Sequence, residues 1–190
     1  MRFIETELAG AYIIEPERLE DERGFFARVS CAREFEGKGL SSTFVQTSIA
    51  YNRKSGTLRG MHFQVAPYEE VKTIRCTAGS IYDVIIDLRP DSSTYRCWAG
   101  VVLSAENHRT LYVPGGFAHG YQTLEDGAEV FYQMSEYYVP ESARGIRWDD
   151  PSIAIHWPDA AERVISDKDR ELPYLAMLSA EEWDTEERHR

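Results

Sequence analysis

A histidine within residues 57–64 is the side chain of this protein best suited to proton chemistry. The segment reads Thr-Leu-Arg-Gly-Met-His-Phe-Gln. Successive side chains of an extended strand point to opposite faces, so Gly60, His62 and Gln64 are expected to share one face. Met61 and Phe63 then share the other. An imidazole gains and loses a proton near neutral pH, so His62 is a candidate general base if the polar face lines a cavity.

Further groups that could take part in proton transfer are Lys72, His119, Tyr132 and Asp169. Tyr132 lies in phase with apolar neighbours on its strand, and a hydroxyl on an apolar interior face needs a partner or a role. Lys72 lies in phase with apolar residues too, and a partly buried ammonium attracts an anionic ligand. Taken singly, each has a simpler interpretation: a strand tyrosine usually belongs to the core, and a strand lysine usually points to solvent.

Two arginines, Arg23 and Arg59, could hold a diphosphate group through paired N–H donors if they lie near the mouth of a cavity. Surface salt bridges are the alternative, because the chain is rich in carboxylates. The formal net charge is −11, which argues against nucleic acid as the main partner.

A resident metal is not expected. The arrangement His62-Phe63-Gln64 has glutamine where a metal-binding barrel would present a second histidine, and no carboxylate accompanies it. His119 follows a Pro-Gly-Gly turn but does not complete a ligand set. No Cys-x-x-Cys pair is present, and the three cysteines are expected to be buried thiols in a reducing compartment. With no apolar run long enough to span a membrane, the sequence predicts a cytoplasmic protein.

The elements that must position these residues are short β-branched and aromatic runs separated by Gly, Pro, Asn and Asp turns. The runs occupy residues 44–49, 57–64, 71–77, 81–88, 95–103, 109–113, 119–124 and 128–139. This pattern is typical of an all-β barrel or sandwich, and we favour a cupin-type jelly roll. Residues 71–88 are expected to form a β-hairpin about Gly79.

Helical patterning is scarce. Residues 32–38 are expected to form one or two turns, and a few short peripheral helices are expected near the C-terminus. We expect a single domain over residues 1–177, followed by a charged tail over 178–190 that is helical or frayed from 179 onward.

Several motifs together resemble one family, the dTDP-4-dehydrorhamnose 3,5-epimerases and their nucleotide-sugar epimerase relatives. They are DERGFF (21–26), LRGMHFQ (58–64), DVIIDLR (83–89), LSAEN (103–107), PGGFAHG (114–120), WDDP (148–151), IHWP (155–158) and SDKD (166–169). The resemblance covers about residues 3 to 175. It implies a cupin-type jelly roll, a homodimer, no catalytic metal and no other cofactor.

The resemblance also implies a reaction. Substrates of the family are nucleoside-diphosphate 4-keto-6-deoxy sugars, whose ketone acidifies the hydrogens on both adjacent carbons. By resemblance, His62 is the base, Asp169 orients it, Tyr132 is the opposing acid and Lys72 stabilises the enolate. Substrate contacts are implied for a further set of residues: Arg23, Arg59, Gln46, His119 and Tyr138.

Two positions depart from the family pattern. Arg28 stands where well-known members carry glutamate, and Ser48 stands where they carry asparagine. Both positions are on the nucleotide side in the family, so the nucleotide could be thymidine, cytidine or guanosine diphosphate. Arg28 could instead pair with a local carboxylate.

Other functions stay open on the sequence alone. A 3-monoepimerase, a 3,4-ketoisomerase acting on a CDP- or GDP-linked sugar, a non-catalytic sugar-nucleotide binder and a metal-dependent cupin are the alternatives.

Overall fold

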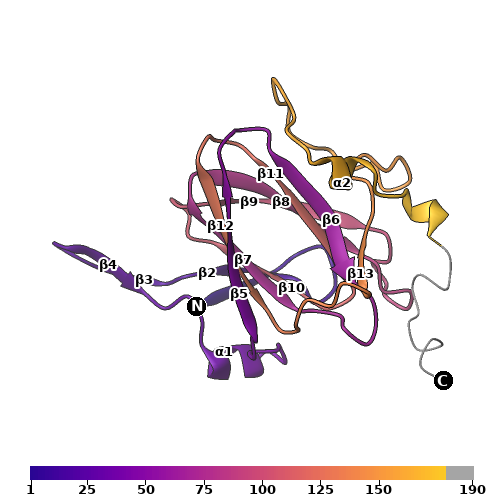
Figure 1. Ribbon diagram of the computed structural model, residues 1–190. Coiled ribbons are helices and arrows are strands. Elements are labelled where there is room, and N and C mark those ends of the chain that lie inside the picture. The colour runs from indigo at the N-terminus through magenta and orange to yellow at the C-terminus, as the bar shows by residue number, and fades with distance from the viewer. Residues whose placement is uncertain (179–190) are drawn as a thin grey trace.

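A computed structural model describes residues 1–178 and shows two antiparallel sheets that face each other (Figure 1). The six-stranded sheet has the order β1 (Arg2–Glu5), β2 (Tyr12–Glu15), β10 (Thr110–Val113), β7 (Lys72–Ala78), β12 (Ala128–Met134) and β5 (Gln46–Asn52). The five-stranded sheet has the order β13 (Ala143–Gly145), β6 (Leu58–Gln64), β11 (Phe117–Thr123), β8 (Ser80–Asp87) and β9 (Trp98–Ser104). The expected all-β, cupin-type barrel is confirmed.

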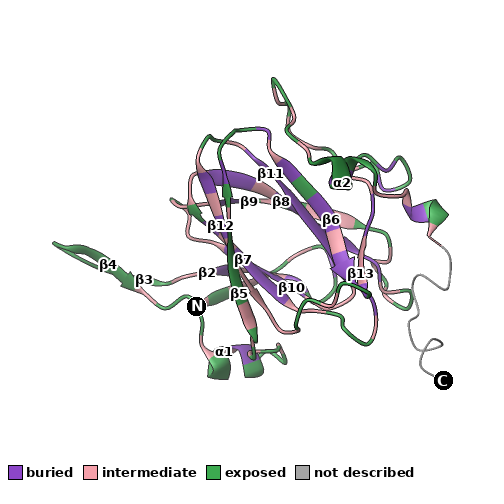
Figure 2. Ribbon diagram, viewed as in Figure 1, coloured by how far each residue is buried: buried purple, intermediate pink, exposed green. Residues whose placement is uncertain are grey.

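Apolar side chains fill the space between the sheets because strand residues of alternate parity point inward. Ile74 of β7, Ile85 of β8 and Val130 of β12 are fully buried in this interior cluster. A second cluster covers the outer face of the five-stranded sheet, where Val84 and Ile86 pack beneath the C-terminal segment. Strand β8 is therefore buried on both faces, which explains its nearly continuous apolar run (Figure 2).

The predicted hairpin at residues 71–88 is wrong. Strand β7 pairs with β10 and β12, whereas β8 pairs with β9 and β11, so the chain passes from one sheet to the other at Gly79. Gly79 has φ +67, and a Cβ there would meet the Cα of Ala128 at 3.2 Å. A glycine between two strands therefore marks a corner of the barrel here and not a tight two-strand turn.

A two-stranded hairpin projects away from the barrel (Figure 1). It comprises β3 (Arg18–Asp21) and β4 (Gly24–Ala27), and most of its residues are exposed. Strands β1 to β4 and β13 lie outside the predicted runs. The last predicted run, 128–139, ends as a strand at Met134.

Helices are short and peripheral, as expected. They are α1 (Ala32–Glu36), α2 (Asp167–Arg170) and the 3-10 helix η1 (Leu175–Met177). The helical or frayed segment predicted at 179–190 lies outside the described residues. Leu178, which was assigned to the tail, packs beside the cluster on the outer face of the five-stranded sheet.

The structure also bears on the burial of the cysteines and on membrane-spanning helices. Of the three free cysteines, Cys76 is buried, whereas Cys31 is half-buried and Cys97 is exposed, so the expectation of three buried thiols is wrong. No helix in residues 1–178 combines the length and the hydropathy that a membrane crossing requires.

Candidate active site

A cavity of about 690 Å3 lies in the barrel and is lined by both sheets and by the C-terminal segment. Eight of the predicted site residues line it: Gln46, Arg59, His62, Lys72, His119, Tyr132, Tyr138 and Asp169. His62 comes from the five-stranded sheet, whereas Lys72 and Tyr132 come from the six-stranded sheet. The candidate base and the candidate acid therefore lie on sheets that face each other.

A register shift in β6 decides which of its side chains enter the cavity. His62 pairs with His119, whereas Arg59 pairs with Tyr121, so three steps on β6 match two steps on β11. This extra residue changes the phase of the strand, and Arg59 lines the cavity together with His62. Strict alternation of side chains along the strand predicts Gly60 on the same face as His62. The register shift places Arg59 on that face instead.

Gly60 is required at this shift. It has φ +115, and a Cβ would meet the Cα of Gly120 at 2.6 Å and the carbonyl oxygen of His119 at 2.8 Å. Strands β6 and β11 approach so closely here that only two glycines facing each other fit.

His62 and Asp169 form the central polar contact of the site. Nε2 of His62 lies 2.8 Å from Oδ1 of Asp169, and Oδ2 of the same carboxylate accepts a hydrogen bond from the backbone N–H of Gly60 at 3.3 Å. Burial alone would raise the pKa of Asp169, but the bonds from His62 and Gly60 hold it below its usual value. The carboxylate is therefore ionised, and one ring nitrogen of His62 is left to accept a proton.

The C-terminal segment brings Asp169 to this position. Val164 exchanges backbone hydrogen bonds with Gly56 and Leu58 at the start of β6, which anchors the segment beside the strand that carries His62. Helix α2 then begins, and its N-cap Ser166 accepts a hydrogen bond from the backbone N–H of Asp169 at 3.1 Å.

Tyr132 is half-buried in the opposite wall. Its ring lies beside that of Tyr121 on β11, with centroids 6.4 Å apart. Burial, followed by the neighbouring Tyr121 and Asp83, raises the pKa of Tyr132 far above that of a free phenol. Tyr132 is therefore protonated at neutral pH and can serve as a proton donor.

Lys72 is buried beside the cavity, and its ammonium pairs with the Glu70 carboxylate at 2.8 Å. The cation is thus held in place by a carboxylate that also lines the cavity. The predicted face of β7, with Lys72 in phase with Ile74 and Cys76, is the interior face.

A second histidine–carboxylate pair, His119 and Asp83, was not predicted from the sequence. Nε2 of His119 lies 2.9 Å from Oδ2 of Asp83, and Asp83 is completely buried. Burial raises the pKa of Asp83, and the nearby His119 and Lys72 oppose this rise only in part. The available signal was phase: Asp83 alternates with Ile81 and Ile85, which are apolar interior positions of β8.

Tyr138 lies at the exposed edge of the cavity and is held by amide side chains. Gln46 accepts a hydrogen bond from the backbone N–H of Tyr138 at 2.7 Å, and Gln64 accepts one from Val139 at 2.7 Å. An aromatic ring at the rim offers a stacking surface for a planar group.

Three predicted site residues do not line this cavity. Arg23 lies in the projecting hairpin, with its side chain 84% exposed and paired with Asp21. Arg28 pairs with Glu34 at 3.2 Å, which is the local carboxylate contact considered for it. Ser48 is exposed on the edge strand β5.

No group of three or more His, Cys, Asp or Glu side chains within residues 1–178 is arranged to hold a metal ion. The two histidines of the cavity instead each pair with one carboxylate.

Comparison with known proteins agrees with this geometry. The family model for dTDP-4-dehydrorhamnose 3,5-epimerase matches residues 5–177. The dTDP-4-dehydrorhamnose 3,5-epimerase of Escherichia coli (strain K12) is 43% identical over 179 residues, which cover 94% of this chain and 96% of that relative.

Solved structures show the same architecture. The dTDP-4-dehydrorhamnose 3,5-epimerase of Bacillus anthracis str. Ames, with TDP and PPi bound, has a TM-score of 0.87 at 44% identity and covers 92% of this chain and 99% of its own. The 3,5-epimerase of Legionella pneumophila Philadelphia 1, in complex with dTDP-4-keto-L-rhamnose, has a TM-score of 0.89 at 38% identity and covers 95% of each chain. The chain belongs to the dTDP-4-dehydrorhamnose 3,5-epimerase family.

Proposed function

We propose that this protein epimerises a nucleoside-diphosphate 4-keto-6-deoxy sugar at C3, C5 or both. The observation that carries the proposal is the pairing of His62 on one sheet with Asp169 of helix α2, and the placement of Tyr132 on the facing sheet. Inversion at carbon requires a proton to leave from one face and return to the other. A base and an acid on opposite walls of one cavity provide these two faces.

Each step uses a group of the cavity. His62 removes the acidic proton next to the ketone, and the Asp169 carboxylate stabilises the resulting imidazolium. The ammonium of Lys72 stabilises the negative oxygen of the enolate. Tyr132 then delivers its proton to the opposite face of the same carbon.

We infer that the nucleotide is thymidine diphosphate. The neighbours carrying TDP or a dTDP-sugar share the fold, and Arg59 and Tyr138 line the cavity at positions suited to a diphosphate and a planar base. The substitutions at Arg28 and Ser48 lie outside the cavity of this protomer.

The test is a panel of dTDP-, CDP-, GDP- and UDP-linked 4-keto-6-deoxy sugars incubated with the enzyme in heavy water and followed by proton NMR. We expect deuterium at C3, C5 or both, inversion at the labelled carbon, and fastest turnover of the dTDP sugar. Migration of the keto group would identify a ketoisomerase, and binding without exchange would identify a non-catalytic binder.

We further propose that the protein is a homodimer in which the projecting hairpin reaches the partner's site. A two-stranded hairpin is at best marginally stable alone, yet this one exposes Leu19, Phe25 and Phe26. Arg23 lies in the turn of this hairpin, which projects away from the barrel (Figure 1), and it does not line the cavity of its own chain. If Arg23 contacts the diphosphate, it must do so in a second copy.

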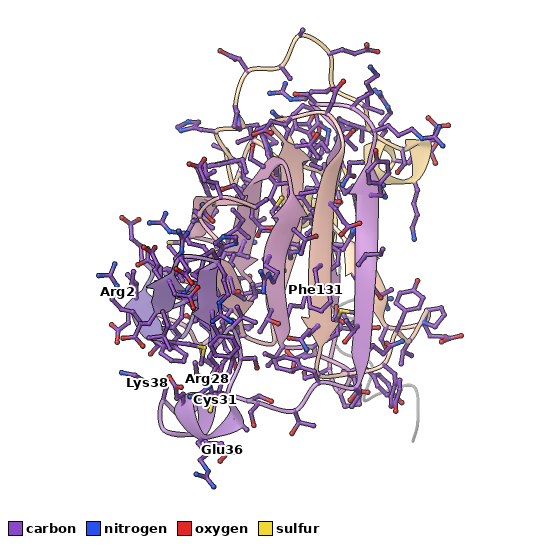
Figure 3. The ribbon with its side chains drawn as sticks, turned by 90° about the vertical axis from the view of Figure 1, so that its left-hand side faces the viewer. Arg2, Arg28, Cys31, Glu36, Lys38 and Phe131 are labelled. Atoms are coloured by element: carbon purple, nitrogen blue, oxygen red, sulfur yellow. The ribbon has the colours of Figure 1, made fainter. Side chains whose placement is uncertain are left out.

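The outer face of the six-stranded sheet suits such an interface. Ile49 and Tyr51 of β5 are exposed there, and Phe131 of β12 lies on the same face, seen in Figure 3 with α1 below it. Arg75 also lies on this face, and its buried Nε has no hydrogen-bond partner within residues 1–178. Exposed large apolar side chains beside an unsatisfied buried donor are typical of a surface that another chain covers. Sedimentation should give a mass near twice 21.8 kDa.

A cytoplasmic location, expected from the sequence, remains a prediction.

A further inference from the structure

A chain of hydrogen bonds runs behind the candidate acid. The hydroxyl of Tyr121 donates to Oδ1 of Asn52 at 3.2 Å, and the same oxygen accepts Nε–H of Arg59 at 2.9 Å. The amide group of Asn52 is fixed in this orientation because its N–H groups donate to the carbonyls of Ala50 and Ala128. Oδ1 of Asn52 is thus an acceptor only.

Tyr121 itself is 1% exposed and Asn52 is 2% exposed, so water does not compete for these bonds. Since the proton of Tyr121 points to Asn52, the lone pairs of its oxygen are free to accept a hydrogen bond from the neighbouring Tyr132 hydroxyl. The two phenol rings lie with centroids 6.4 Å apart, on strands of facing sheets.

We infer that Tyr121 is a positioning residue for Tyr132: it holds the acid's hydroxyl in the resting cavity and donates a hydrogen bond to the phenolate that remains after proton transfer. The inference rests on the proposed role of Tyr132.

Protonation of the enolate by Tyr132 moves one proton and leaves a negative charge on the phenol oxygen. The O–H bond of Tyr132 breaks, a C–H bond forms on the enolate carbon, and the electron pair stays on the Tyr132 oxygen. The proton removed earlier remains on His62, and both groups return to their starting state by exchange with water. During the step, the Tyr121 hydroxyl turns from Asn52 to the new phenolate.

This assistance matters because burial of the Tyr132 hydroxyl disfavours its charged form. A buried phenolate without a donor is unfavourable, and Asp83 nearby adds a repulsive negative charge. Proton removal by His62 on the other wall does not require Tyr121. Loss of the Tyr121 hydroxyl should therefore impair delivery of the proton and spare its removal.

The test compares Tyr121→Phe with wild type in heavy water, using the dTDP-linked 4-keto-6-deoxy sugar. Deuterium in recovered substrate reports proton removal and return on the His62 side, whereas inverted product reports delivery from Tyr132. We expect inversion to fall about 10- to 100-fold, exchange to change less than about threefold, and KM to stay near the wild-type value.

Two further variants make the test specific. Tyr112→Phe is a matched control, because Tyr112 is also a buried tyrosine but its hydroxyl accepts from the backbone N–H of Ser41 on the other side of the sheet. It should leave the ratio of exchange to inversion unchanged. In a double-mutant cycle, adding Tyr121→Phe to Tyr132→Phe should cost nothing further.

The outcomes separate the two proposals. If Tyr132→Phe loses inversion while Tyr121→Phe keeps the wild-type ratio, or loses exchange and inversion equally, the inference about Tyr121 is overturned alone. If Tyr132→Phe inverts as well as wild type, the proposed function and the inference are overturned together.

Discussion

His62 depends on a carboxylate that is distant in sequence but in direct contact with the ring. Asp169 is almost fully buried, and its low pKa keeps it charged throughout the range in which imidazole titrates. A charge held this way stabilises the imidazolium formed on proton removal. In the proposed mechanism the pair, and not His62 alone, therefore acts as the base.

Replacing Asp169 with asparagine should lower kcat by about 10²- to 10⁴-fold with little change in KM. Asparagine keeps the shape of the aspartate side chain but carries no negative charge to stabilise the imidazolium. The rate is measured by NMR from deuterium exchange next to the ketone. Asp167→Asn, an exposed site on the same short helix, is the control and should stay within about twofold of wild type. Equal loss in both variants would argue against a specific role for Asp169.

At the level of single side chains, motifs, strand phase and the family resemblance together predicted the four candidate catalytic residues. His62, Lys72, Tyr132 and Asp169 all line one cavity. Their supporting partners Asp83, Tyr121 and Asn52 were not predicted, because a side chain that acts through a neighbour is recognisable only when the fold has brought the two together.

The strand pair β6 and β11 sets the geometry of the site. The extra residue at Gly60 turns Arg59 toward the cavity, and the close approach to Gly120 leaves no room for a Cβ. Alternation in the sequence predicted the strand correctly but not this change of phase, because a bulge depends on pairing with a partner strand.

Gly60→Ala should therefore destabilise the protein by roughly 1–3 kcal/mol and reduce turnover more than the loss of folded protein explains. Chemical denaturation and NMR assays measure the two effects. Gly39→Ala has a positive φ of +71 with no atom within 4 Å of the added methyl, so it shares the backbone penalty without the clash. Full activity in folded Gly60→Ala would show that the spacing of the two strands is not critical.

The last residue of β8 is another carboxylate with a clear pH signature. Burial would raise the pKa of Asp87, but hydrogen bonds from Arg89, Ser92 and Thr94 lower it to about 2. A carboxyl with a lowered folded pKa contributes stability above its unfolded pKa near 4, and this contribution is lost as the pH falls toward 2.

Asp87→Asn should accordingly reduce the free energy of unfolding at pH 7 by about 2 kcal/mol, and the difference from wild type should shrink between about pH 4 and pH 2. Urea denaturation across this range provides the measurement. Asp91→Asn, at an exposed position of the turn that follows β8, should behave like wild type. A difference that stays constant with pH would contradict the assigned role of the ionised carboxylate.

Within one protomer, the predicted substrate-binding residue Arg23 does not line the cavity. Sequence resemblance supplies a list of residues but does not say which copy of the chain provides each one. The β3–β4 hairpin, which carries Arg23, also fell outside the predicted strands, because its exposed residues show none of the apolar alternation that marks a packed strand.

A mixing experiment tests the shared site. Arg23→Ala and His62→Asn variants should each be poorly active alone. When co-expressed in equal amounts, half of the dimers are mixed and each contains one complete site, so activity should recover to about a quarter of wild type. Sedimentation of each variant checks that dimers form. No recovery in mixed dimers would place Arg23 outside the partner's site.

The order of the elements along the chain has a consequence for biosynthesis. The last barrel strand, β13, ends at Gly145, yet the carboxylate that completes the base is Asp169, held by a segment anchored beside β6. A nascent chain therefore completes the synthesis of its strands before it presents the partner of His62. Competence for proton removal arrives only when the final segment emerges and docks, so a chain that ends after β13 lacks the carboxylate beside the imidazole.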